Sequence, residues 1–98
     1  MDRSGLIKKL RAAKGDLERL GIRHLALFGS VARGDATGAS DIDVLVRFAP
    51  DTEISLLDVV HLENELSDLL GTAVQVVREP VKHGPLRARV EAERVNVF

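Results

Sequence analysis

Apolar residues near the start of the chain recur at intervals of four, three, four and three, which is the spacing of one face of an α-helix. These residues are Leu6, Leu10, Ala13, Leu17 and Leu20. Ser4 fits the N-cap of this helix, and Gly21 fits the position after its end. The pattern predicts one helix that buries its leucine stripe and turns its lysines and arginines toward solvent.

Two apolar segments with strand character follow, at residues 22–28 and 41–48. Gly29 ends the first, and Ser30 is expected to cap a short helical turn over residues 31–33. Residues 34–40 are small and polar, which predicts a loop.

A long helix is expected from about Ile54 to Leu70, with Asp51 or Thr52 as its cap and Gly71 as its stop. Its predicted buried stripe is formed by Val59, Leu62, Leu66 and Leu69. A valine-rich strand at 73–77 follows this helix.

A last helix is expected from Pro85 to about Arg94, and a short strand at 95–98. The order helix, strand, turn, strand, helix, strand, helix indicates an α+β (mixed α/β) fold, a small mixed β-sheet covered by helices. With 98 residues, we expect one domain that spans positions 1–98.

Composition narrows the class of protein. There is no cysteine, which excludes disulfides and thiolate chemistry, and three scattered histidines do not suggest zinc. No segment has the length of a membrane span, and the N-terminal residues lack the apolar core of a signal peptide. We therefore expect a cytoplasmic protein without membrane contact.

The net charge of −1 gives no reason to expect a nucleic-acid partner, and no aromatic residues are interleaved with the basic ones of the first helix. The charges are unevenly distributed, with eight Lys/Arg against three Asp/Glu in residues 1–34 and one against nine in residues 35–72. This asymmetry fits steering of a phosphate-bearing ligand, and it fits ordinary solvated helix faces equally well.

The candidate chemistry lies in the second strand. Asp41 and Asp43 are two residues apart, so their side chains should share one face, while Ile42, Val44 and Val46 fill the other. Two carboxylates beside an apolar core are costly unless they are paired or bind a cation, and hard cations such as Mg²⁺ prefer oxygen ligands. The alternative is a pair of edge charges that blocks aggregation.

The turn at Gly29 and Ser30 could present free N–H groups to an anion, with Arg33 as a nearby positive charge. Ser30 could equally be only a helix cap, and Arg33 an ordinary surface arginine. We expect this turn to lie opposite the two aspartates.

The motif Gly29-Ser30-Val31-Ala32-Arg33-Gly34, followed by Asp41-Ile42-Asp43-Val44, resembles the signature of the minimal nucleotidyltransferases, small relatives of the DNA polymerase beta superfamily. The resemblance implies transfer of a nucleoside monophosphate from ATP or another nucleoside triphosphate, with Mg²⁺. It implies that Gly29 and Ser30 hold the triphosphate, that Arg33 assists, and that Asp41 and Asp43 bind the metal and are catalytic.

Many such domains resemble the antitoxin half of a toxin–antitoxin pair. Their partner is an all-helical HEPN ribonuclease, and some adenylylate a tyrosine of that partner. The resemblance thus implies a nucleotidyltransferase-type antitoxin that transfers a nucleotide, expected to be AMP, to a HEPN-type toxin.

One position departs from that family's pattern. Gln75 stands where a third aspartate is expected, and an amide cannot act as a general base or neutralise a metal. Glu79 has the same strand parity and is the alternative source of that group. Two hypotheses follow: an active nucleotidyltransferase, or a catalytically weakened domain that neutralises its partner by binding.

We also expect the chain to associate with itself or a partner. A domain of this size buries a limited share of its surface, and Ile7, Val81 and Phe98 are left over from the predicted stripes. The alternative is that these three residues complete the core.

Overall fold

The structure is a computed structural model that describes residues 2–35 and 40–98. Its elements are α1 (Arg3–Ala12), α2 (Lys14–Arg19), β1 (Ile22–Phe28), α3 (Gly29–Arg33), β2 (Ile42–Phe48), α4 (Leu56–Leu70), β3 (Val74–Arg78), α5 (Pro85–Glu93) and β4 (Val95–Asn96). Part of the predicted loop, residues 36–39, lies outside the described residues.

The four strands form one sheet in the order β3-β2-β1-β4. β1 pairs antiparallel with β2 and with β4, whereas β2 pairs parallel with β3. The parallel pair requires a crossover, which α4 provides between β2 and β3. The predicted α+β fold with a small mixed sheet is confirmed.

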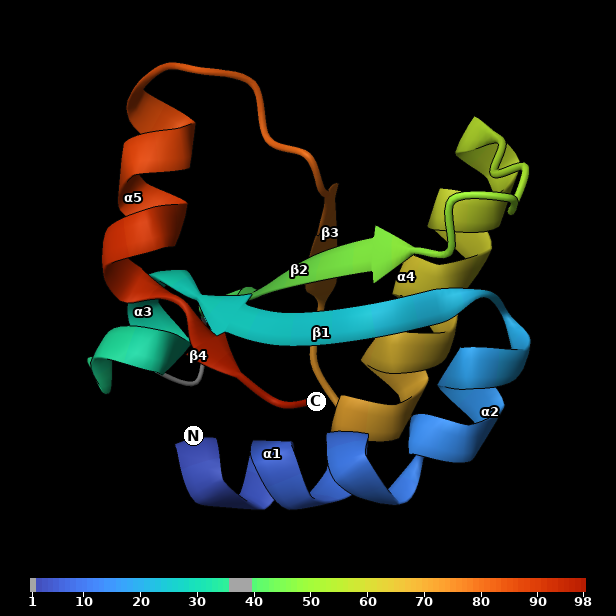
Figure 1. The fold of residues 1–98 in the computed structure, drawn as a ribbon. Coiled ribbons are helices and arrows are strands. Elements are labelled where there is room, and N and C mark those ends of the chain that lie inside the picture. Colours follow the sequence, from blue (N-terminus) through green and yellow to red (C-terminus); the bar gives the residue numbers. More distant parts are fainter. Residues whose placement is uncertain (1, 36–39) are drawn as a thin grey trace.

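Helices cover both faces of this sheet (Figure 1). One face carries Leu25, Leu27, Val44 and Val46 and packs against α1, α2 and α4 in the larger core. The other face carries Ala26, Phe28 and Leu45 and packs against Val90 of α5 in a smaller core. Asp43 shares strand parity with Leu45, so it belongs to the α5 face.

Side chains of α4 fix the edge strand β3. The Glu63 carboxylate accepts a hydrogen bond from the Val76 N–H at 2.8 Å, and the Ser67 hydroxyl accepts one from the Val74 N–H at 3.0 Å. With β3 held in this way, Gln75 is the register partner of Asp43. The residue that departs from the expected pattern therefore lies beside the candidate metal ligand.

The helix boundaries correct several predictions. The single N-terminal helix is divided into α1 and α2, because Ala13 leaves helical geometry at φ −90° and ψ 3°. The N-cap of α1 is Asp2, which accepts a hydrogen bond from the Ser4 N–H, so Ser4 is not the cap. Gly21 has φ 96° and follows α2 as predicted.

The caps of α3 and α4 also differ from prediction. α4 begins after Ser55, whose hydroxyl and the Asp58 carboxylate form a capping box, so neither Asp51 nor Thr52 is the cap. Gly71 ends α4 at φ 74°, as predicted. Phe28 is the N-cap residue of α3, so Ser30 lies inside that helix and does not cap it.

The predicted reason for association is wrong. Ile7, Val81 and Phe98 are partly buried against the two cores, so they complete the cores. Leu69, which was predicted to be buried, is 38% exposed, and Leu70 is buried instead. Large exposed apolar side chains in the described residues are Leu20, Leu56, Leu57, Val60, Leu69 and Leu86. Association itself stays a prediction.

In the part of the chain that is described, no helix is both long and apolar enough to span a lipid bilayer.

Candidate active site

Asp43 and Gly29 meet where β1 turns into α3. Phe28, the last residue of β1, is the register partner of Asp43 on β2. Gly29 has φ 75°, a conformation that side chains rarely adopt, and a Cβ built there would overlap Oδ2 of Asp43. A glycine is therefore required at this position for both the turn and the close approach of the carboxylate.

The Asp43 side chain is half-buried, and none of the described residues forms a hydrogen bond or a close ion pair with it. Burial raises its pKa, Arg89 opposes this shift, and the negative charges of Asp41 and Glu93 add to it. Arg33 also opposes the shift, and no hydrogen bond from the described part of the chain contributes to this balance. A carboxylate that is costly to ionise and close to another one is typical of sites that receive a cation.

Asp41 lies one residue before β2 and is exposed. Its Oδ2 accepts a hydrogen bond from the Gln75 side-chain amide at 3.1 Å. Since Gln75 is also the register partner of Asp43, the three side chains gather on the α5 face at one end of the parallel pair. The predicted shared face of Asp41 and Asp43 is confirmed, and their predicted roles stay predictions.

The predicted anion-binding turn already has a partner. The Gly29 N–H donates to Oε2 of Glu93 at 3.0 Å, and Arg33 donates to Oε1 of the same residue at 2.8 Å. Arg33 also donates to Asp35 at 3.2 Å, and these two carboxylates raise the pKa of its guanidinium. Ser30 is half-buried as the second residue of α3.

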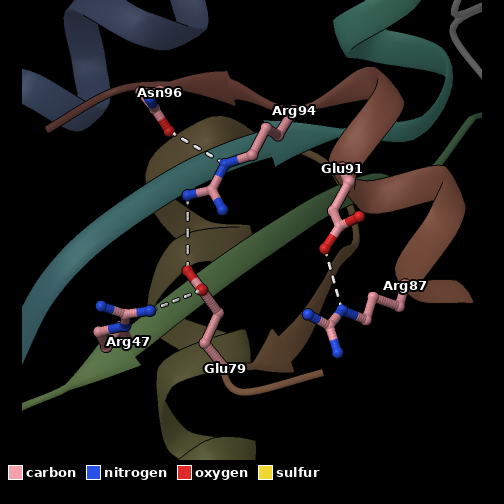
Figure 2. A network of polar contacts seen from close by, with 6 residues as sticks. All are labelled: Arg47, Glu79, Arg87, Glu91, Arg94 and Asn96. Atoms are coloured by element: carbon pink, nitrogen blue, oxygen red, sulfur yellow. Dashed lines mark hydrogen bonds and ion pairs between the residues drawn. The ribbon is translucent and has the colours of Figure 1, made fainter. Parts of the chain in front are cut away.

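Glu79, the alternative third carboxylate, lies elsewhere on this face. Its two oxygens pair with Arg47 at 3.2 Å and with Arg94 at 3.5 Å, and Arg94 also donates to Asn96 (Figure 2). Glu79 follows the far end of β3, four residues beyond Gln75, or roughly 13 Å along an extended strand. Its ion pairs give it a structural place and do not support its use as the missing base.

Sequence reasoning missed two residues of this site, Arg89 and Glu93, both on α5. Their charges act on Asp43, although they lie about fifty residues away in sequence. The spacing of four on one helix could have placed them on a shared face, but no local signal indicated that this face meets the Gly29 turn.

The donor set fits Mg²⁺ bound together with a nucleotide. Mg²⁺ commonly takes one or two carboxylates and completes its shell with phosphate oxygens and water. Asp41 and Asp43 supply two such carboxylates, and a bound cation would offset the cost of ionising the desolvated Asp43. Among the described residues, no three His, Cys, Asp or Glu side chains form a ready-made metal cluster.

Comparison with known proteins shows the family to which this chain is similar. The profile of the nucleotidyltransferase domain family matches residues 7–96. Protein adenylyltransferase MntA of Thermococcus cleftensis is 47% identical over 70 residues, which cover 69% of this chain and 68% of that protein.

Solved structures share the fold. A protein provisionally assigned as a minimal nucleotidyltransferase is 37% identical, with a TM-score of 0.77 over 97% of this chain and 95% of the other. A chain from the complex of a tri-AMPylated Shewanella oneidensis HEPN toxin with its MNT antitoxin is 18% identical, with a TM-score of 0.60 over 89% and 70% of the two chains. The second likeness concerns the fold alone.

Proposed function

The chain belongs to the nucleotidyltransferase domain family, and from this premise we propose that it transfers AMP from ATP to a protein, with Mg²⁺, as the antitoxin of a toxin–antitoxin pair. The observation that carries the proposal is the Asp43 carboxylate, which is desolvated, accepts no hydrogen bond from any described residue, and packs against a glycine that begins a turn. A module that only binds a partner has no need to maintain that cost.

Each residue of the site has a proposed role. Asp41 and Asp43 hold the metal, and the turn at Gly29 and Ser30 and the Arg33 guanidinium hold the triphosphate. When bound, Mg²⁺ neutralises charge on the phosphates and stabilises the leaving pyrophosphate.

In the proposed reaction the oxygen of an acceptor hydroxyl attacks the α-phosphorus of ATP. The new bond joins that oxygen to AMP, and the bond to pyrophosphate breaks with its electron pair leaving on pyrophosphate. The hydroxyl proton passes to solvent water, because the amide of Gln75 cannot accept it. The protein groups of this end of the sheet therefore contribute mainly binding and orientation.

The proposed acceptor is a HEPN-type toxin. Two similarities support this choice: a relative is named a protein adenylyltransferase, and a protein that shares the fold was solved with an AMPylated HEPN toxin. A reaction that uses ATP fits the cytoplasmic location expected from the sequence.

A second candidate function is neutralisation by binding alone, with weak catalysis. The contact that favours it is the hydrogen bond from the Gln75 amide to Asp41, because it places a neutral donor where the family's pattern has a third carboxylate. General-base catalysis contributes on the order of 10² to 10⁴-fold, so its loss would slow transfer and leave ATP binding intact.

Transfer of label from α-³²P-ATP to a purified HEPN-type toxin tests the proposal. We expect Mg²⁺-dependent labelling by the wild type and none by a variant with both Asp41→Asn and Asp43→Asn. If the wild type binds the partner and neutralises it without any labelling, the second function is correct. Labelling that survives the double substitution would refute the proposed metal site.

A further inference from the structure

The side chain of Glu93 occupies the two donors that the proposed function assigns to phosphate. Its Oε2 accepts from the Gly29 N–H at 3.0 Å, and its Oε1 accepts from Arg33 at 2.8 Å. The carboxylate is 17% exposed, so these contacts are partly shielded from water. One carboxylate thus bridges a backbone N–H and a guanidinium, which is the donor pair that a phosphate oxygen would use.

A phosphate and this carboxylate cannot use the same donors together. Both are anions, and each donor hydrogen has one strong acceptor direction. Glu93 also adds a negative charge near Asp43, so it disfavours further negative charge in the same place.

We propose that Glu93 controls access of the nucleotide to the site: its carboxylate holds Gly29 and Arg33 in the free protein, and the triphosphate displaces it. The inference rests on the proposed function. It names Glu93 as a determinant of affinity and of anion selectivity, because a multiply charged triphosphate competes with a carboxylate better than a monophosphate does. Pyrophosphate release would be aided when Glu93 returns to the donors.

The expected change in nucleotide affinity follows from the fraction of free protein in which Glu93 occupies the two donors. If Glu93 leaves the donors free for one tenth of the time, the apparent dissociation constant for the nucleotide is raised about tenfold. The contacts of Glu93 comprise one charged hydrogen bond to the backbone and one partly exposed ion pair, which is consistent with an effect of about three- to tenfold.

Glu93→Gln tests the inference, because it keeps the shape of the side chain and removes its charge. Titration calorimetry with Mg-ATP, and with tripolyphosphate as a probe without nucleoside, should show binding about three- to tenfold tighter than in the wild type. Glu91→Gln is the matched control, since it removes one charge from the same helix while its carboxylate pairs with Arg87 and not with the turn. The control should change affinity less than twofold.

The outcomes separate this inference from the proposed function. If the wild type binds Mg-ATP and Glu93→Gln binds it equally or more weakly, Glu93 only positions Arg33 or joins α5 to α3, and the inference is wrong. If neither protein binds Mg-ATP, the proposed function fails as well.

A measurement on the wild type avoids any effect of the substitution on folding. The Gly29 amide resonance should move when tripolyphosphate is added, and the side-chain carboxyl carbon of Glu93 should shift at the same ligand concentration as its hydrogen bond is lost. A Glu93 carboxyl signal that stays fixed while ligand saturates the protein would overturn the inference.

Discussion

Asp43 and Glu79 both lie on the α5 face of the sheet, but their surroundings differ. Glu79 is 12% exposed and pairs with Arg47 and Arg94, so its charge is compensated within the protein. Asp43 is half-buried, accepts no hydrogen bond within the described ranges 2–35 and 40–98, and has a pKa that burial raises. Asp43 lies on β2, and Glu79 directly follows β3, the neighbouring strand in the sheet.

This difference distinguishes a carboxylate with a structural role, Glu79, from one with a proposed functional role, Asp43. A buried carboxylate that serves stability is expected to come with its partners, because an unpaired one costs free energy. The charge of Asp43, which burial disfavours, instead lies near a glycine turn, Asp41 and Arg89, where a cation and phosphates could compensate it. We therefore propose the end of the sheet at Asp43 as the functional end. The ion pairs of Glu79 join the residue after β3 to β2 and to the C-cap of α5.

The largest expected effect comes from adding the missing third carboxylate beside Asp43. Gln75→Asp places a third carboxylate at the register partner of Asp43, and we expect transfer of AMP to rise by about 10² to 10⁴-fold. The labelling assay measures this rate, with Gln75→Asn as the control of equal length without charge. No increase with Asp, or an equal increase with Asn, would show that the missing carboxylate is not what limits the reaction.

A smaller effect is expected at the structural end. Glu79→Gln leaves Arg47 and Arg94 without their shared carboxylate and should lower the free energy of unfolding by about 1 to 2 kcal/mol. Affinity for Mg-ATP should stay unchanged. Urea denaturation gives the first quantity and calorimetry the second. A large loss of nucleotide affinity in a folded protein would place Glu79 at the functional end after all.

The smallest effect is a gain in stability from Asp43→Asn. Asp43 ionises at lower pH in the unfolded chain than in the folded protein, because its pKa is raised in the folded protein. The folded state therefore loses stability as pH rises through the unfolded and then the folded pKa. Asn removes this penalty, so Tm should rise at pH 7, on the order of one degree after solvent screening, and not at pH 3. A lower Tm at pH 7 would mean that ionised Asp43 stabilises the fold.

Much of the site could be predicted from local pattern. Strand alternation is strict, so the aliphatic residues between and after the aspartates fixed which face Asp43 would take. The positive φ of Gly29 followed from its place between a strand and a turn. The family resemblance singled out Gln75, and the parallel pairing of β2 and β3, which had not been predicted, places it beside Asp43.

Other features depend on contacts that no local pattern reveals. Several residues before α4 could act as caps, and the one that does, Ser55, was recognisable only from Asp58 three positions later. Glu93 and Arg89 join the site because α5 packs across the sheet, a placement set by tertiary contacts of Val90. The pairing of Glu79 with Arg47 and Arg94 likewise requires three separate segments.

The comparison between the two ends can be tested directly with Mn²⁺, which replaces Mg²⁺ and broadens the amide resonances of nearby residues. In the presence of ATP, substoichiometric Mn²⁺ should remove the amide signals of Gly29, Asp43 and Gln75 while those of Arg47 and Glu79 persist. Broadening centred on Glu79, or spread evenly over the acidic surface of α4, would contradict the assignment of the Asp43 end as the metal and nucleotide site.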